Sequence, residues 1–489
     1  MGSIHRPIVA ILPNWYLRRS KQRRRLVPRN YDIAPMPMRL WFVMCLSCTT
    51  VLLASTSAHP QSTAPSTDEL LKHFGAAPNG LARYDYLNSV LPVVDGDEKL
   101  LTLQLLATVD SELGLYNEAV MAFPFDNRIA PPKNTPLPHT DAWHSIDAAD
   151  AVANLATQRR IVMINEAHHD AHTRELTLAL LPRLWALGFR YFAVEALSDK
   201  DADLMRRGYA IDASGSEYLL EPLYGEIVRQ AIKLGYIIVP YDSDSASFDN
   251  RETIQAQTLY EKVFAKDPQA KLFVHAGYSH IDKAAGNLGD DIKPMAMQLK
   301  VLSGYDPLCV DQVQFRDVAV GGLDFGFYAK VASLFFSKNP IVLRNSNTGA
   351  IWSSDPRQHD VTVILPPAAE SDLDTSDDKT PDFKLDVLRH IVVLPRDPLN
   401  INERPSWLTL DGKRVASPIS TELCMGQIPC VIDAYYPSEP DTAIPADRYT
   451  FVHPRSHNVL YLYPGHYRLR AWNAAGTTLS QQEIDVPAH

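Results

Sequence analysis

Two apolar, strand-like runs of this chain are followed at once by histidines and a carboxylate. Residues 161–164 lead into Glu166 and His168, and residues 271–274 lead into a second segment that ends at His280. A buried parallel strand reads as a short apolar run, and open α/β sheets bind ligands beyond the carboxyl ends of such strands. Imidazole and carboxylate groups at that place can activate water or bind a divalent cation. The two segments therefore predict a His/Glu site.

The elements that would position these side chains follow a βαβ rhythm between residues 140 and about 345. The expected strands are 160–164, 191–196, 236–241, 271–275, 307–313 and 340–343. A leucine stripe predicts a helix that ends before Gly188, and further helices are expected over 217–234 and 251–265. Connections of this length allow right-handed crossovers in one parallel sheet. The carboxyl ends of its strands would also gather Glu195, Asp242, Asp244 and Asp311.

Four short motifs give the chain a resemblance to a known superfamily. They are Asn165-Glu-Ala-His168, the strand-end Glu195, Arg251-Glu252 and Gly277-Tyr-Ser-His280. Together they resemble the superfamily that joins ChaN-like haem-binding uptake proteins, Tiki-type metalloproteases and erythromycin esterases, over residues 155–315. That resemblance implies a three-layer α/β/α domain with a mainly parallel sheet. Asn165 stands where the first motif has glycine, and because Asn tolerates positive φ, we expect the backbone turn to persist there.

The resemblance implies two alternatives for the chemistry. In the esterase-like alternative His168 is a general base, and a carboxylate holds its tautomer while it activates water. The candidate catalytic set is His168, Glu166, Glu195 and His280. In the Tiki-like alternative a mixed His/carboxylate shell binds Mn, Co or Zn and lowers the pKa of a bound water. Its candidate metal ligands are His168, His280, Glu166, Glu195 and Asp242, and in a ChaN-like protein the ligand would be haem.

Further residues near these motifs are candidates for binding or support. Arg251 begins a helix and could clamp a substrate carboxylate or orient Glu195 through its planar fork. Tyr278 could donate a hydrogen bond to an oxyanion or pack as an aromatic residue. His275 lies inside a strand run, as a supporting residue or with a direct role. His169 is expected beside His172 on an exposed turn, where either could be an axial ligand if haem binds.

Composition narrows the class of protein. The chain has 489 residues, 46% of them apolar and 21% charged, so it is globular and long enough for two or more domains. Its net charge is −10, and the first 58 residues hold nine Lys and Arg against one acid. The rest is more acidic still, which disfavours a nucleic-acid partner and suits a small-molecule or peptide substrate. We find no Gly-x-Ser-x-Gly elbow, phosphate loop, dinucleotide fingerprint or His-Glu-x-x-His motif.

The basic N-terminal segment predicts export. Residues 40–54 form a mostly apolar run after Arg39 and before a small-residue stretch that ends at Ala58. This pattern is typical of a signal peptide in residues 1–58, and the run is short for a membrane span. Translation starts at Met1 or at one of two internal methionines, Met36 and Met38, and the alternative to cleavage is an uncleaved anchor with a basic cytoplasmic tail. Cleavage would leave no span and a periplasmic or cell-envelope protein. In that oxidising compartment Cys424 and Cys430 can close a disulfide, while Cys309 stays free.

The remaining segments complete the predicted domain plan. Residues 61–135 are expected to be helical with a turn at Gly114, and residues 140–365 form the α/β domain. An acidic linker at 366–385 precedes a small Ig-like β-sandwich over 388–489. Its expected strands are 390–394, 407–410, 430–436, 449–452, 459–463, 466–472 and 479–486.

Three functions remain open at this stage. The first is an exported hydrolase in which the His/Glu site activates water against an ester or amide bond. The second is a haem- or metal-binding uptake protein without turnover, which would use the same histidines as ligands. The third is an enzymatically inactive envelope scaffold, which the departure at Asn165 allows.

Overall fold

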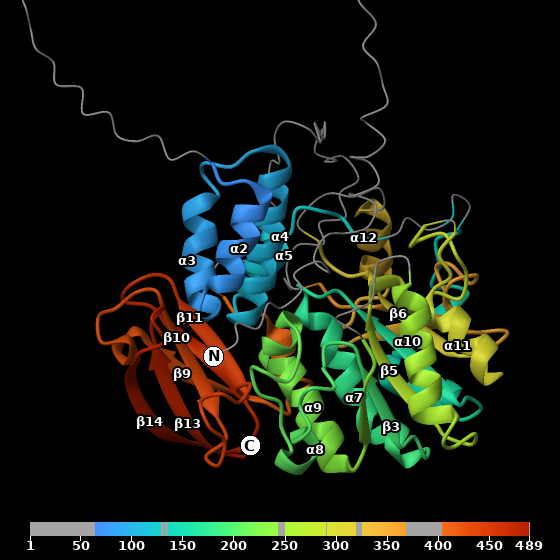
Figure 1. The fold of residues 1–489 in the computed structure, drawn as a ribbon. Coiled ribbons are helices and arrows are strands. Elements are labelled where there is room, and N and C mark those ends of the chain that lie inside the picture. The colour runs from blue at the N-terminus through green and yellow to red at the C-terminus, as the bar shows by residue number, and fades with distance from the viewer. Residues whose placement is uncertain are drawn as a thin grey trace, which may run out of the picture.

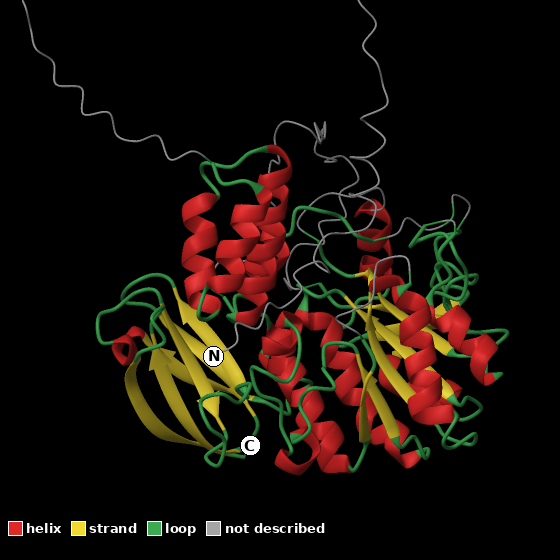
Figure 2. Ribbon diagram, in the orientation of Figure 1, coloured by secondary structure: helices red, strands yellow, loops and turns green. Residues whose placement is uncertain are grey.

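The computed structural model describes residues 64–128, 132, 135–242, 250–289, 291–318, 325–367 and 403–488. The predicted signal peptide, Asp244, most of the acidic linker and the strand expected at 390–394 lie outside these residues. The described chain forms an N-terminal group of helices, a large α/β part and a C-terminal group of antiparallel strands (Figures 1 and 2). None of the described helices is long and apolar enough to cross a membrane.

The N-terminal helices share a hydrophobic core with the C-terminal strands. Their bounds are α2 Thr67–Ala76, α3 Gly80–Val90, α4 Gly96–Glu112 and α5 Tyr116–Ala122. The turn between α4 and α5 is at Gly114, whose φ of +74° lies in the left-handed region that glycine adopts without strain. Phe74, Leu105 and Val109 pack in one cluster with Ile432 and Leu469. This segment therefore packs mainly on the β region (Figure 1).

An eight-stranded sheet with the order β1-β7-β8-β6-β2-β5-β3-β4 forms the centre of the α/β part. Its strands are β1 Trp143–Asp147, β2 Ile161–Glu166, β3 Tyr191–Val194, β4 Ile237–Pro240, β5 Leu272–Gly277, β6 Leu308–Phe315, β7 Ile341–Asn345 and β8 Val361–Ile364. Among the described strands of this sheet, β7 runs in the opposite direction to the other seven. The mainly parallel sheet is thus confirmed, while β1 and β8 were not predicted.

Helices cover both faces of this sheet. The bounds of the helices and short turns are α6 Ala148–Ala156, η2 Ala171–Arg174, α7 Glu175–Ala186, α8 Leu204–Arg207, η3 Glu217–Leu220, α9 Pro222–Leu234, α10 Arg251–Leu259, η4 Tyr260–Phe264, η5 Tyr278–Ile281, α11 Met295–Ser303 and α12 Phe325–Leu334. Helices α6, α7 and α9 pack on one face through a cluster that includes Leu180 and Ile227. Helices α10 and α11 cover the other through Leu259 and Leu299. The result is a three-layer arrangement (Figure 2).

The C-terminal strands form a four-stranded sheet with the order β11-β10-β13-β14 and a two-stranded sheet of β12 and β9. Their bounds are β9 Val415–Ser420, β10 Cys430–Tyr435, β11 Asp447–Phe451, β12 His457–Leu462, β13 Gly465–Trp472 and β14 Thr478–Val486, with 3₁₀ turns η6 Ser406–Thr409 and η7 Thr421–Cys424. Antiparallel strands are confirmed in this region, and the Ig-like topology stays a prediction. Cys424 and Cys430 form a disulfide, and Cys309 is free and buried.

One expected strand in this region is wrong. Residues 407–410 lie in the 3₁₀ turn η6 and its C-terminal cap, because Leu410 has φ of +48° and Asp411 and Gly412 follow at +57° and +74°. Three successive left-handed residues turn the chain and cannot continue a strand. The strand β9, which begins three residues later at Val415, was missed.

Candidate functional site

The candidate site is built around a Glu–His pair at the end of β2. Glu166 is the last residue of β2 and is 1% exposed. Nδ1 of His168 lies 2.9 Å from Oε1 of Glu166. An ionised carboxylate only accepts hydrogen bonds, so this contact assigns the proton to Nδ1 and leaves the lone pair of a neutral ring on Nε2. Within the described residues Nε2 of His168 has no hydrogen-bond partner.

A fully buried arginine holds Glu166 in place. Nε of Arg174 donates to Oε2 of Glu166 over 2.6 Å, and its Nη1 donates to Glu221 over 2.9 Å. The hydroxyl of Tyr116 also donates to Glu221, over 2.7 Å. Burial by itself raises the pKa of Glu166, but Arg174 and contacts from two histidines outweigh it and hold the pKa well below its usual range. Glu166 is therefore an anion whose orientation is fixed.

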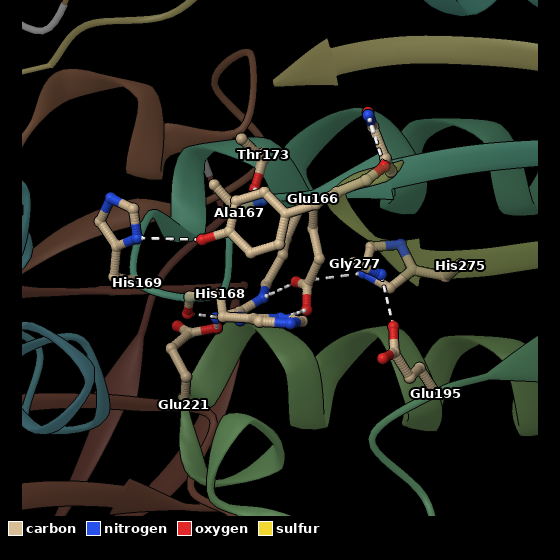
Figure 3. A network of polar contacts seen from close by, with 12 residues as sticks. Glu166, Ala167, His168, His169, Thr173, Glu195, Glu221, His275 and Gly277 are labelled. Atoms are coloured by element: carbon tan, nitrogen blue, oxygen red, sulfur yellow. Dashed lines mark hydrogen bonds and ion pairs between the residues drawn. The ribbon is translucent and has the colours of Figure 1, made fainter. Parts of the chain in front are cut away.

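His275 supports the same carboxylate from β5. Its ring is fully buried, with Nε2 3.2 Å from Oε2 of Glu166 and Nδ1 3.0 Å from the hydroxyl of Thr177. Tyr224 meets the ring edge-on at 5.3 Å between centroids. The ring has no exposed surface, so the structure places His275 as a supporting residue for Glu166 (Figure 3).

The ring of His168 is held between an aromatic face and a glycine. Tyr218 stacks on it with 3.8 Å between centroids and an interplanar angle of 9°. On the other side the ring lies against Gly277, and Tyr278 meets its edge at 5.1 Å. The side chain of His168 stays 16% exposed. These contacts fix the ring plane and place Cε1 and Nε2 against Gly277.

Glu195 lies on the same side of Gly277 as His168, because a Cβ at position 277 would meet both side chains. Oε2 of Glu195 accepts a short hydrogen bond from the backbone N–H of Gly277, and Oε1 accepts one from Nη2 of Arg251 over 2.6 Å. Nε2 of His280 lies 3.4 Å from the same Oε1. Burial raises the pKa of Glu195, but His280 and Arg251 outweigh that effect and lower the pKa strongly. Glu195 is thus a second permanent anion beside the His168 ring.

His280 is enclosed by carboxylates. Its Nδ1 lies 2.6 Å from Oε1 of Glu252, opposite the contact of its Nε2 with Glu195. Burial alone lowers the pKa of His280, but Glu252 and Glu195 together raise the pKa to about 10. At neutral pH His280 is therefore an imidazolium with no lone pair for a proton or a metal. It suits the role of holding Glu195 better than that of a base or ligand.

Arg251 is placed as the orienter of Glu195. Its Nε and Nη2 both donate to Asp242, over 3.1 and 2.6 Å, and Nη2 also donates to Glu195. Gln255 donates to the same Asp242 over 3.0 Å. Since these donors are already used within the protein, the structure favours the orienting role over the substrate clamp.

His169 and His172 are buried, which corrects the exposed turn that we expected. His169 is 2% exposed and stacks on Phe123 at 3.6 Å between centroids, and the hydroxyl of Tyr278 lies 3.4 Å from its Nδ1. Burial lowers the pKa of His169 well below its usual range. His172 is 6% exposed and stacks on Trp407. The segment after β2 turns inward because Asp170 caps the 3₁₀ turn η2 under the N-terminal helices.

Asn165 does not occupy a turn, so the argument from positive φ was wrong. It lies in β2, where it pairs with Ala276, and its side chain forms hydrogen bonds to neighbouring segments. Nδ2 donates to the carbonyl of Tyr278 over 3.1 Å and to Oδ1 of Asp311 over 2.9 Å. Its Oδ1 accepts from the backbone N–H of Gln312 over 2.8 Å. Asn165 thereby ties β2 to β6 and to the turn that carries Tyr278, whose own φ is +43°.

The candidate metal ligands do not form a metal site. Among the described residues, no three His, Cys, Asp or Glu side chains are grouped so that they could hold a metal ion. The physical reason lies in the two arginines, because Arg174 pairs with Glu166 and Arg251 pairs with Glu195 and Asp242. A cation would have to displace a guanidinium from each carboxylate. The residues of the predicted shell, His168, His280, Glu166, Glu195 and Asp242, lie in two ion-paired networks in the structure, and metal binding by them stays a prediction.

The surroundings of His168 do not fit haem either. Nε2 of His168 lies against Gly277, and the cavity lined by Tyr278 has a volume of about 30 Å³. Pockets for cofactor-sized ligands usually measure roughly 300–1,000 Å³. The Phe123 ring covers a face of His169. A larger cavity, of about 380 Å³, is lined by His172, Glu175 and Trp407.

Some members of the site were not found from sequence. Arg174, Glu221 and Tyr218 come from η2, from the residue before α9 and from η3, and none follows a predicted strand. Glu221 precedes Pro222, which is a recognisable helix start, but that signal predicts a cap and not a partner for Arg174. Glu252 was part of a quoted motif without an assigned role.

No protein-family model and no curated protein matches the chain. Solved structures that are similar include a structure described as bacterial protein toxins, with 17% identity and a TM-score of 0.27 over 34% of this chain and 36% of that chain, so this protein spans about a third of its length. The type III effector HopBA1 matches with 14% identity and a TM-score of 0.27 over 49% of this chain and 96% of that chain. ChaN of Campylobacter jejuni, whose structure shows cofacial haem binding, matches with 12% identity and a TM-score of 0.24 over 39% of this chain and 96% of that chain.

Proposed function

We propose that this chain is an exported hydrolase in which the Glu166–His168 pair activates water against an ester or amide bond. The observation that carries the proposal is the contact of 2.9 Å between Nδ1 of His168 and a carboxylate that is itself held by Arg174. A general base needs a free lone pair at a defined place, and this arrangement leaves Nε2 as that lone pair.

The reaction would proceed through the residues already described. Nε2 of His168 takes a proton from water as the oxygen attacks the carbonyl carbon, and Glu166 stabilises the imidazolium that forms. When the tetrahedral intermediate collapses, the imidazolium returns the proton to the leaving oxygen or nitrogen. Oε2 of Glu195 lies on the same side of Gly277 as the His168 ring, where this anion can accept the second hydrogen of the attacking water.

The cellular location is part of this proposal. The disulfide between Cys424 and Cys430 supports an oxidising compartment. The signal-peptide pattern of residues 1–58 supports passage to the periplasm or cell envelope.

A panel of chromogenic esters, lactones and peptide amides tests the proposal with purified protein. His168→Ala and Glu166→Gln should each lower the rate by about a hundredfold or more, as removal of a general base or its orienting carboxylate does. The matched control is His144→Ala, which removes an exposed histidine on β1. If any hydrolysed substrate is turned over equally by wild type and His168→Ala, the assignment of the base is wrong.

A further inference from the structure

A small polar cavity lies next to the Glu166–His168 pair, between β6 and η5. Its volume is about 30 Å³, and it is lined mostly by acids and amides. The lining residues that matter here are Asn165, Tyr278, Asp282, Asp311, Asp355 and His359. Tyr278 joins the cavity to the site, because its ring also meets His168 edge-on.

Asp311 supplies an unused acceptor in this cavity. The residue is 3% exposed, and Oδ1 accepts from Nδ2 of Asn165 over 2.9 Å and from the N–H of Val313 over 3.1 Å. Its Oδ2 is buried and has no hydrogen-bond partner. A buried carboxylate oxygen without a donor is costly, so native proteins usually give it a partner from the protein, from ordered water or from a ligand.

Several of the donors around the cavity are already used. Nε2 of His359 lies 2.8 Å from Oδ1 of Asp282, and Asn287 donates to the other oxygen of Asp282 over 2.6 Å. Nδ2 of Asn165 serves Asp311 and the carbonyl of Tyr278. With Asp355 also in the lining, three carboxylates surround a space with one basic side chain. The cavity therefore favours a cation that only donates.

We propose that this cavity binds a small cation of the ammonium type and that, in the proposed hydrolase, it holds the protonated amine of the substrate. A primary ammonium group has three donors, no acceptor and about the volume of one water molecule, which suits the unused Oδ2 of Asp311. A divalent metal fits less well, because no three acidic or histidine side chains of the described residues are grouped for coordination.

The assignment of the substrate's amine to this cavity rests on the proposed function. Tyr278 lines the cavity, and its ring centroid lies 5.1 Å from that of His168, so this residue joins the cavity to the candidate base. The substrate class is therefore an ester or amide with a primary amine close to the scissile carbonyl, such as an aminoacyl compound. An uncharged acyl compound would lose this contact.

Cation binding is tested first, without any turnover. Methylammonium, tetramethylammonium and sodium chloride are compared at equal ionic strength, by calorimetric titration and by melting temperature of the full chain. Methylammonium should bind saturably, and the other two cations should not. Asp311→Asn should weaken methylammonium binding at least tenfold, while Asp199→Asn, at an exposed ion pair with Lys262, should leave it unchanged. Equal responses to all three salts would overturn the proposal.

A second variant covers the case in which Asp311→Asn does not fold. Asp355→Asn removes a lining charge whose ion pair with Arg357 is long, at 3.4 Å, and exposed at the arginine, so it should weaken methylammonium binding even if Asp311→Asn fails to fold. Unchanged binding in Asp355→Asn and in a folded Asp311→Asn would contradict the cavity assignment.

Hydrolysis assays test whether the cation that binds in the cavity is the protonated amine of the substrate. Wild type should prefer p-nitrophenyl glycinate over p-nitrophenyl acetate, and Asp311→Asn should lose that preference. His168→Ala should still bind methylammonium while losing hydrolysis. If methylammonium binds and no ester is cleaved, the hydrolase proposal fails and the cavity remains a site for free cations. If both esters are cleaved with the same ratio in wild type and Asp311→Asn, the substrate-amine assignment fails.

Discussion

The imidazole of His168 occupies the space that a side chain at Gly277 would need. A Cβ at position 277 would lie 2.6 Å from Nε2 of His168 and 3.2 Å from Oε2 of Glu195. The backbone φ of Gly277 is −77°, which any residue adopts, so the requirement for glycine comes from the neighbouring side chains and not from conformation. The glycine of the Gly-x-x-His motif is therefore where β5 approaches the candidate base.

Gly277→Ala should displace the His168 ring and lower both activity and stability. Forcing a methyl group into a well-packed place costs about 1–3 kcal/mol of unfolding free energy. Because the main clash is with the ring, His168→Ala should be less than additive with Gly277→Ala in a double-mutant cycle followed by urea unfolding. Strict additivity of the two losses would show that the ring does not occupy this space.

Arg174→Ala should be strongly destabilising, since it leaves Glu166 and Glu221 buried without their partner. Removal of one partner from a buried ion pair costs about 3–5 kcal/mol. Arg183→Ala is the matched control, because its pair with Asp150 has exposed side chains and should contribute less than about 1 kcal/mol. Urea unfolding of both variants gives the comparison, and similar losses for the two arginines would contradict the buried network.

Site residues at or shortly after the end of a predicted strand could be predicted from sequence, and Tyr218, Arg174 and Glu221, which follow no predicted strand closely, could not. Apolar runs marked β2 and β5, and the parallel arrangement of those strands brings Glu166 and His275 to the same edge of the sheet. Tyr218 and Arg174 come from the short turns η3 and η2. Their positions depend on how these turns pack against β2, which no local spacing encodes.

Contacts with segments far away in the sequence also explain why the exposure of some residues was predicted wrongly. His169 follows a strand and precedes polar residues, which is the pattern of a surface turn. It is buried because Phe123, far away in the sequence, stacks on its ring. Likewise β1 was missed because its residues are partly exposed polar side chains at the sheet edge, and its pairing with β7 comes from a segment about 200 residues later in the chain.

Because of His280, the unfolding free energy of the protein should decrease as the pH becomes alkaline. Its pKa rises from 6.5 to about 10 in the folded chain through Glu252 and Glu195. A raised folded pKa means that the stabilisation is complete below about pH 6.5 and is lost as the pH rises through 10. The unfolding free energy of wild type should fall over this interval, and that of His280→Asn should fall less. His144→Asn, an exposed histidine, should follow wild type. NMR of the ring should show an imidazolium at neutral pH, and a neutral ring there would contradict the assignment.

Removal of metal ions should leave the stability and any hydrolytic activity of the protein unchanged. Glu166 and Glu195 are each within 2.6 Å of a guanidinium nitrogen, and this contact supplies the positive charge that a bound cation would otherwise provide. Asp242 has the same neighbour as Glu195. Dialysis against a chelator, with elemental analysis before and after, should therefore change neither the melting temperature nor the rate on a hydrolysed substrate. A stoichiometric metal whose loss lowers both, and which His168→Ala fails to retain, would show that the ion pairs rearrange around a coordination site.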